Sequence, residues 1–422
     1  MPAPASPPPR VATAATLLAA STLTVMAPTI VAPALPSIAR AFADTPSVEV
    51  LAPLVLTLPA LVIACTASAV GALVDRSGRR PVLLTGIVLY GLAGGTGLVV
   101  GSLPALLAGR VGLGLAVAMV LTAVTTLIAD LYGGVERGRM LSRQAAVMGV
   151  SGTVFTVASG FLAATSWRLS FLLYPLAWLL LPVVLRVVPE PVRPARRGAG
   201  AASTRSAAVP GPGTVTTPGW DDHQPPGPPP LMGRAATVVV TVSIALLLGV
   251  QVLFYLLPVQ LPFVLEEVFV LGPARTGLLV AIPPLAYAGA SLLATRFATD
   301  RRRASVVAAA AAVTGTGYLA IGTATTLWAV ALGLLVGGAG LGLIVPNLVA
   351  WVAHAAPPHL RGRLVGLMTS ALFLGQFLSP LLWSPVVGSL GRQGALSVAA
   401  VVLLAAAPVA LAMDTVRRSR AP

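Results

Sequence analysis

The sequence predicts an all-helical integral membrane protein with twelve transmembrane helices in two pseudo-symmetric six-helix bundles. An apolar composition, twelve long apolar segments and an internal repeat support this fold class. Of the 422 residues, 56% are hydrophobic and 9% are charged, and the mean hydropathy is +0.91. Soluble domains carry roughly a quarter charged residues. Much of this chain therefore needs lipid as its solvent.

Twelve apolar segments are long enough to cross a bilayer, which takes about 20 residues per helix. Backbone polar groups in lipid must be satisfied within the segment, so each segment is expected to be a helix. The first is longer than the roughly 7–15-residue core of a signal peptide, so we expect it to be a transmembrane helix. The predicted spans are Val11–Pro36, Val50–Val74, Pro81–Val100, Leu103–Ile128, Ala145–Ala164, Leu169–Val188, Ala236–Leu261, Thr276–Ala294, Ala304–Ile321, Leu327–Val352, Leu364–Leu390 and Ala395–Met413.

The composition changes between the sixth and seventh predicted spans. Residues 189–234 are rich in Pro, Gly, Ser, Thr and Arg and poor in bulky apolar residues, so they cannot bury enough surface to fold. This predicts a disordered cytoplasmic linker between an N-terminal bundle, residues 1–188, and a C-terminal bundle, residues 235–422. A proline-rich segment that binds a partner is the alternative interpretation.

The charges predict how the chain is oriented. All 27 basic residues are arginine. If both termini are cytoplasmic, only Arg40, Arg168, Arg275 and Arg392 fall on the outer side, and Arg110 lies within a span. Because cytoplasmic loops of membrane proteins carry excess basic residues, we expect a multi-pass protein of the cell (inner or plasma) membrane with cytoplasmic termini. The net charge of +15 is then a topology signal, and binding of nucleic acid is not needed to explain it.

The chain also repeats itself at about half its length. The sequence Arg-Gly-Arg at Arg137–Arg139 precedes the fifth predicted span, and the same sequence at Arg361–Arg363 precedes the eleventh, 224 residues later. Arg168 and Arg392 precede the sixth and twelfth spans at the same offset. Matches at one offset on equivalent loops predict two parallel six-helix halves, related by an axis along the membrane normal.

The loop after the second predicted span reads Gly71-Ala-Leu-Val-Asp75-Arg76-Ser-Gly78-Arg79-Arg80. It resembles the signature loop of the major facilitator superfamily, G-x-L-x-D-R-x-G-R-R, at every fixed position. The resemblance implies the major facilitator fold and transport of a small molecule along a path between the two halves. A charged turn that only enforces topology is the alternative for the loop itself. We expect a conformational switch on the cytoplasmic side, formed by Gly71, Asp75, Arg76, Gly78, Arg79, Arg80 and Asp130.

Other segments point to one branch of the superfamily. Thr29–Ile38, Ile128–Leu131 and Gly375–Pro380 resemble its bacterial drug-efflux and arabinose-efflux-like members. This resemblance implies alternating-access export of small organic molecules, coupled to protons. Antiporters of the superfamily carry G-P-x-x-G-G in the fifth span, where Phe155–Gly160 keeps only the final glycine. An uncoupled facilitator or importer of sugars or small organic acids therefore stays open, as does a non-transporting membrane sensor.

Arg110 is the only charge well inside a predicted span. The run Arg110–Gly114 resembles a second family motif of proton-coupled members, R-x-x-Q-G, with Leu113 in place of the glutamine. A charge within a bilayer is costly unless it faces water or a partner. One interpretation places Arg110 in the transport cavity. In the other, it lies near the outer interface and extends its guanidinium toward water.

The predicted cavity is apolar, with sparse polar groups and Arg110 as its only fixed charge. It suits an amphiphilic or weakly anionic small molecule, with protons as a second partner if transport is coupled. The residues that could carry such a proton, Asp75, Asp130, Glu266, Glu267 and His354, lie in loops or at span ends. We expect a monomer. The remaining candidates for contact with the substrate or for coupling are Gln251, Tyr255, Gln260, Tyr287, Asn347, Phe373 and Gln376.

The sequence offers no chemistry beyond transport. It contains no phosphate-binding loop of the form G-x-x-x-x-G-K-S/T, so no ATP motor is expected. Its histidines, His223, His354 and His359, have no metal-ligand spacing with cysteine or carboxylate residues. No nucleophile–base pattern is found either. We therefore expect no enzyme activity, no cofactor and no metal ion.

Overall fold

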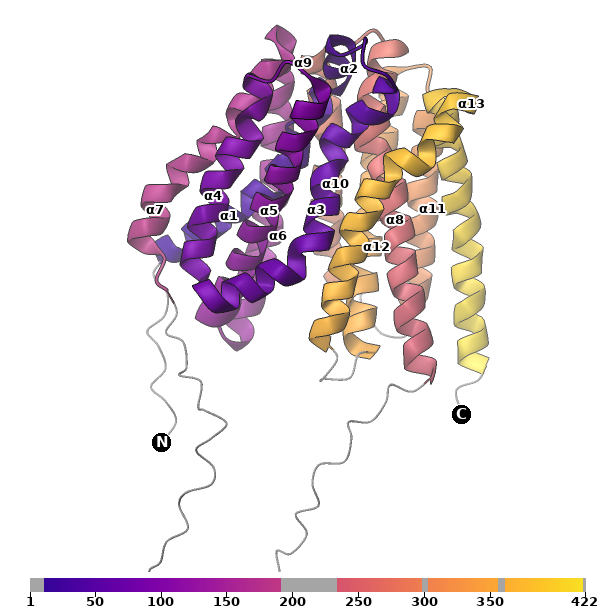
Figure 1. The fold of residues 1–422 in the computed structure, drawn as a ribbon. Coiled ribbons are helices and arrows are strands. Elements are labelled where there is room, and N and C mark those ends of the chain that lie inside the picture. Colours follow the sequence, from indigo (N-terminus) through magenta and orange to yellow (C-terminus); the bar gives the residue numbers. More distant parts are fainter. Residues whose placement is uncertain (1–10, 191–233, 298–302, 356–360, 420–422) are drawn as a thin grey trace, which may run out of the picture.

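The computed structural model describes residues 11–190, 234–297, 303–355 and 361–419. Within these ranges the regular elements are helices, and no strand occurs. The start of α1 (Val11–Thr29) and the end of α13 (Arg361–Ser419) lie at the same end of the molecule (Figure 1). We call this end the termini end and the opposite one the far end.

The N-terminal bundle contains the elements between residues 11 and 187. Its first span is interrupted near the far end because Pro28, Pro33 and Pro36 supply no backbone N–H for a continuous α-helix. Its elements are α1, η1 (Ala32–Ala34), α2 (Leu35–Ala41), α3 (Val48–Ser77), α4 (Arg79–Gly94), η2 (Gly95–Leu98), α5 (Leu103–Leu131), α6 (Gly134–Thr165), η3 (Trp167–Leu173), η4 (Pro175–Leu179) and α7 (Leu180–Val187).

The C-terminal bundle contains the elements from residue 234 onward. The last of them, α13, passes through Gly391, whose φ of 71° and ψ of 176° are not helical. Glycine is the residue that adopts such a positive φ without steric cost, so Gly391 lets two spans follow one another without a loop. The elements of this bundle are α8 (Arg234–Glu267), α9 (Pro273–Val280), α10 (Ile282–Phe297), α11 (Arg303–Gly322), α12 (Leu327–Ala355) and α13.

The twelve predicted spans all have helical counterparts. Ten helical stretches in the described residues are long and apolar enough to cross a membrane. The last stretch, Gly366–Pro408, covers the predicted eleventh and twelfth spans, which meet at Gly391. The predicted eighth span corresponds to α9 and α10, which are each too short to be counted alone. The twelve-helix membrane fold is therefore confirmed.

Helix ends differ from the sequence prediction where charges occur inside a helix. The fifth span begins at Gly134 rather than at Ala145. The extra turns carry Glu136, Arg139 and Arg143, and these charges exclude the turns from a span defined by its apolar residues. Backbone hydrogen bonds of an α-helix do not require apolar side chains, so the helix continues beyond the lipid.

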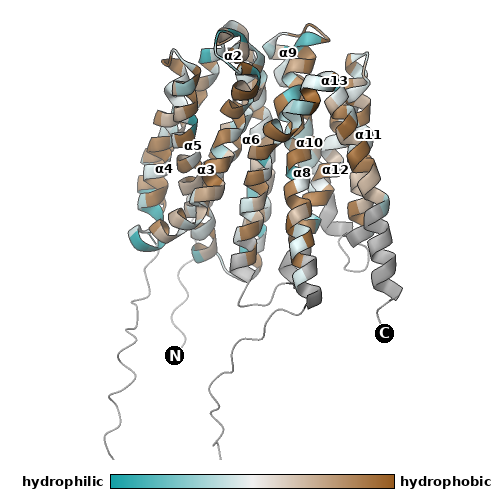
Figure 2. Ribbon diagram, turned by 45° about the vertical axis from the view of Figure 1, so that its right-hand side comes forward, coloured by the Kyte–Doolittle hydropathy of each residue, from teal (hydrophilic) through white to brown (hydrophobic). Residues whose placement is uncertain are grey.

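The helices pack into two groups that meet along a limited set of contacts. In the first group α3 and α4 pack on α5, and α1 packs on α6. In the second, α11 packs on α12 and α13, and α8 packs on α13. Between the groups, α3 contacts α13, and α6 contacts α9 and α10. Figure 2 shows apolar residues along the helices and many of the hydrophilic ones toward the two ends.

The predicted linker, residues 189–234, lies outside the described residues except for Pro189, Glu190 and Arg234. Its disorder and the domain boundaries that depend on it therefore stay predictions.

Candidate functional site

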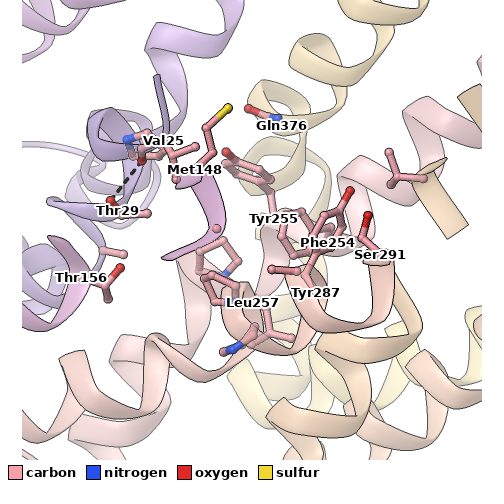
Figure 3. A pocket seen from close by; sticks show the side chains of 18 of the residues that line it. Val25, Thr29, Met148, Thr156, Phe254, Tyr255, Leu257, Tyr287, Ser291 and Gln376 are labelled. Carbon is pink, nitrogen blue, oxygen red and sulfur yellow. Dashed lines mark hydrogen bonds between the residues drawn. The ribbon is translucent and has the colours of Figure 1, made fainter. Parts of the chain in front are cut away.

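A cavity of about 500 Å³ lies between the two bundles. In the close view, Val25, Thr29 and Thr156 lie across the space from Phe254 and Tyr287 (Figure 3). The N-terminal bundle lines it with Val25, Pro28, Thr29, Ala32, Ala145, Ala146, Met148, Gly149 and Thr156. The C-terminal bundle lines it with Gln251, Phe254, Tyr255, Leu257, Pro258, Leu261, Val280, Pro283, Pro284, Tyr287, Ala288, Ser291, Leu292, Val345, Leu372, Phe373 and Gln376.

Helical periodicity brings the polar lining residues together. On α8, Gln251, Tyr255 and Pro258 follow one another at spacings of four and three residues, so they share one face. On α10, Tyr287 and Ser291 are four residues apart and also share a face. These two faces form the larger part of the polar lining of the cavity.

Five of the predicted substrate residues line this cavity. They are Gln251, Tyr255, Tyr287, Phe373 and Gln376. Phe254, Pro258 and Ser291 also line it, although the sequence analysis did not select them. Their spacing from Gln251, Tyr255 and Tyr287 was the signal that could have found them.

Gln260 and Asn347 lie elsewhere. Gln260 follows Gln251 by nine residues on α8, which is about 13 Å along the helix, and its Oε1 accepts a hydrogen bond of 2.7 Å from Nη1 of Arg392 near the far end. Asn347 is 2% exposed, and its Nδ2 donates 2.7 Å to the carbonyl of Leu343 in the same helix. The assignment of both residues to the cavity lining is therefore wrong.

Arg110 occupies neither of the two positions considered from the sequence. It is fully buried inside the N-terminal bundle and does not line the cavity. Its Nη1 donates 3.0 Å to the hydroxyl of Tyr174, and its Nη2 donates 2.8 Å to the carbonyl of Gly94. The guanidinium carbon also lies 4.9 Å from the centre of the Phe171 ring. Carbonyl, hydroxyl and aromatic partners replace part of the water that a buried arginine would otherwise need, while its Nε has no hydrogen-bond partner.

Arg110, Gly94, Phe171 and Tyr174, which we call the Arg110 cluster, contact the wall of the cavity indirectly. The Tyr174 hydroxyl donates 2.7 Å to the carbonyl of Ala27, which precedes the lining residues Pro28 and Thr29 on α1. Arg110 therefore supports the backbone of α1 through Tyr174, while its own charge stays out of the cavity.

Charged residues join the two bundles at the far end. Arg40 of α2 donates to the carboxylate of Glu266 at the end of α8. The neighbouring Glu267 accepts 3.0 Å from Nε of Arg392, just after the bend in α13. Glu266 thus binds across the two bundles, whereas Glu267 binds within the C-terminal one.

The same end contains a close approach of the two bundles. A Cβ added to Gly160 of α6 would lie 2.8 Å from the carbonyl oxygen of Pro273 and 2.9 Å from the Cα of Gly277 in α9. Side chains would not fit at this crossing. The one glycine kept from the antiporter pattern in the fifth span is therefore a packing contact between the bundles.

The signature loop forms its described contacts within the N-terminal bundle. Nε of Arg79 lies 2.9 Å from Oδ2 of Asp130 at the end of α5, and Nη2 of Arg79 lies 3.8 Å from Oδ1 of Asp75. The side chain of Asp75 is 73% exposed. Arg80 donates to the carbonyl of Leu185 in α7. The loop thus ties together α3, α4, α5 and α7.

Glu190 completes this loop, although it was assigned to the linker from the sequence. Its two carboxylate oxygens accept hydrogen bonds of 2.7 Å each from the backbone N–H groups of Arg79 and Arg80, the first residues of α4. A carboxylate at a helix N-terminus accepts hydrogen bonds from the free N–H groups there, and its negative charge interacts favourably with the positive end of the helix dipole. Gly78 has a φ of 100°, and a Cβ there would lie 2.6 Å from Oε1 of Glu190. The motif glycine is thus needed both for its backbone angle and for the space that Glu190 occupies.

The described residues contain no group of three or more His, Cys, Asp or Glu that could hold a metal ion. The arrangement can enclose a small molecule between two walls that belong to different bundles.

A family model described as Major Facilitator Superfamily matches residues 17–380 and 254–422. The chain belongs to the major facilitator superfamily. A search of curated proteins gave no significant match.

Solved structures of this superfamily share the fold. The human organic anion transporter MFSD10 (TETRAN) is 19% identical, with 96% of this chain and 100% of that chain covered and a TM-score of 0.67. A D-xylose–proton symporter is 15% identical, with 94% and 96% covered and a TM-score of 0.72. A bacterial homologue of the human lysosomal transporter Spinster, in an inward-facing and occupied conformation, is 15% identical, with 97% and 98% covered and a TM-score of 0.70. At these identities the likeness shows the fold alone.

The Arg110 cluster predicts a stability effect. We expect Arg110→Leu to destabilise this major facilitator protein by roughly 3 kcal/mol, because two buried hydrogen bonds to a charged group are lost. Arg110→Lys should retain part of the stability, since it keeps the charge without the planar fork. The melting temperature of the purified protein measures both, with the exposed Arg143→Leu as the control. Wild-type melting of Arg110→Leu would contradict the structural role.

The contact of Glu190 with α4 predicts a defect in the signature loop. We expect Glu190→Ala to lower the transport rate several-fold at normal expression, because two N–H groups at the start of α4 lose their acceptor. Gly78→Ala should have a larger effect, since it also strains the backbone. Initial rates in vesicles measure this, with the exposed Glu136→Ala as the matched control. Equal rates for Glu190→Ala and Glu136→Ala would show that the contact is dispensable.

Proposed function

We propose that this protein is a secondary active transporter that exports small organic molecules across the cell membrane by alternating access. The observation that carries the proposal is the cavity between the two bundles, whose walls belong to different halves of the chain. A relative movement of the bundles would expose such a cavity first on one side of the membrane and then on the other.

The distribution of arginine supports cytoplasmic termini, which makes the far end the outer end. On this assignment the structure is the inward-facing state. The contacts between bundles at Arg40, Gly160 and Glu266 hold the outer end closed. The lining residues of α6 extend from Thr156 toward the termini end as far as Ala145.

The outer ion pair is weak enough to open and close as a gate. The side chains of Arg40 and Glu266 are 64% and 25% exposed, and an ion pair in such a setting contributes about 0–1 kcal/mol. It can therefore break and re-form during a transport cycle. The glycines at the crossing of α6 and α9 let the helices pack closely without an interlocking side chain.

Export and proton coupling are supported by the resemblance of Thr29–Ile38, Ile128–Leu131 and Gly375–Pro380 to the bacterial efflux branch. In this proposal the coupling proton binds at carboxylates near the bundle ends, with Glu266 and Asp130 as the candidates. Glu266 bridges the two bundles and Asp130 binds the signature loop, so a proton on either would weaken a contact of the transport machinery.

A second candidate is an uncoupled facilitator or importer of sugars or small organic acids. It is favoured by the described lining of the cavity, in which no acid, histidine or other charged side chain occurs. The likeness in fold to a D-xylose–proton symporter is compatible with a sugar-sized substrate.

Inside-out vesicles with an imposed pH gradient separate these candidates. We expect radiolabelled chloramphenicol, an uncharged amphiphile, to accumulate in the vesicles only when their lumen is acidic. Equilibration without accumulation would favour the facilitator. Failure to move chloramphenicol or any member of a panel of sugars and organic acids would contradict transport and favour a sensor.

The outer ion pair predicts a shift between conformations. We expect Glu266→Gln to increase the outward-open population up to about fivefold, the effect of losing about 1 kcal/mol. The charge swap, Arg40→Glu combined with Glu266→Arg, should restore the wild-type ratio of inward-open to outward-open molecules. Spin labels at Ala43→Cys and Val268→Cys, in a Cys65→Ala background, report the distance across the outer end. An unchanged distance distribution in Glu266→Gln would contradict the gate.

A further inference from the structure

The polar groups of the cavity are divided unequally between its two walls. On the N-terminal wall the hydroxyls are already used within their own helices. Thr29 donates 3.0 Å to the carbonyl of Val25 (Figure 3), and Thr156 donates 2.7 Å to that of Gly152. The rest of that wall consists of proline, glycine and apolar side chains. It offers a ligand an apolar surface.

The C-terminal wall offers unused hydrogen-bonding groups. The side chains of Gln251, Tyr255, Tyr287, Ser291 and Gln376 make no hydrogen bond to any other described residue. None of their polar atoms is enclosed without a partner, unlike Oδ1 of Asn347. They therefore face the cavity space. Two amides and three hydroxyls supply both donors and acceptors.

Formal charge is absent from the described lining of the cavity. The sequence suggested Arg110 as a charge within the cavity, but in the structure Arg110 is buried in the N-terminal bundle. A charged ligand would lose its hydration here without gaining an opposite charge, and that loss is large in an apolar site. An uncharged ligand with hydroxyl or amide groups can replace its lost water by the free amides and hydroxyls of the C-terminal wall.

We infer that the substrate is an uncharged amphiphile, bound with its hydroxyl- or amide-bearing edge on α8, α10 and α13 and its apolar edge on α1 and α6. The inference rests on the proposed transport function and narrows the substrate class, since it excludes the weakly anionic molecules that the sequence suggested. It also assigns recognition of polar groups to Gln251, Tyr255, Tyr287, Ser291 and Gln376.

A series of ligands that differ in charge tests the class. Chloramphenicol is uncharged and carries a nitrophenyl ring, an amide and two hydroxyls. Its deacylated amine is a cation near neutral pH, and its succinate ester is an anion. Binding of radiolabelled chloramphenicol to the full chain in lipid nanodiscs, with the two charged analogues as competitors, measures the preference without requiring transport.

We expect both charged analogues to compete at least about tenfold more weakly than unlabelled chloramphenicol. Equal or stronger competition by either one would overturn the inference, as would the absence of chloramphenicol binding at millimolar concentration. The vesicle assay decides transport separately. Binding with this preference but no transport would leave the inferred substrate class intact and contradict the proposed function. Transport of the charged analogues would support the proposed function and contradict the inferred substrate class.

Substitutions test the division between the walls. Tyr255→Phe combined with Tyr287→Phe removes two hydroxyls from the polar wall and should weaken chloramphenicol binding at least about fivefold. Tyr132→Phe, which removes a hydroxyl outside the cavity, should bind as wild type. Thr29→Val should weaken binding less than the double variant, because its hydroxyl already binds Val25. A larger loss with Thr29→Val would overturn the assignment of the walls.

A gain of function gives a test that a folding defect cannot imitate. Gln376→Glu places a carboxylate in the cavity with little change in shape. We expect it to reverse the preference, so that the amine competes better than chloramphenicol itself. An unchanged order of competition in a variant that still binds would show that Gln376 does not face the ligand.

Discussion

A charge that leaves water must find partners within the protein, and this constraint accounts for where the described charges of the protein lie. Arg110 satisfies it within one bundle, by a hydroxyl, a carbonyl and two aromatic rings. The remaining described charges lie toward the two ends of the helices, where Arg40 and Arg79 bind carboxylates. The space between the bundles is thereby left with amides, hydroxyls and apolar side chains.

The two ends use different chemistry for different tasks. At the termini end, Arg79 and Arg80 of α4 bind Asp75 of α3, Asp130 of α5 and the carbonyl of Leu185 in α7. These contacts tie four helices of one bundle into a unit that can move as a whole. At the far end, Arg40 and Glu266 connect the two bundles through a partly exposed ion pair. The ion pair between the bundles can break while the contacts within a bundle persist, as rigid-body movement requires.

The candidate site could be predicted only in part. Gln251, Tyr255 and Tyr287 line the cavity, because polar side chains in an apolar span have few places to lie other than a cavity; their contact with a substrate stays a prediction. The same rule failed for Gln260, which binds Arg392 instead, and for Asn347, whose amide turns back onto its own helix. Glu190 was missed because local composition assigns it to the linker, whereas its partners lie 110 and 111 residues earlier in the chain.

The sequence by itself determined the membrane class, the twelve spans and the family, because each follows from composition summed over about 20 residues or from a contiguous motif. Only the tertiary structure decided which side chains share the cavity, that Arg110 lies outside it, and that Glu190 binds the start of α4. Those outcomes depend on how each helix is rotated about its axis and on which helix it crosses. Rotation and crossing are set by packing between residues far apart in the chain, such as Gly160 and Gly277.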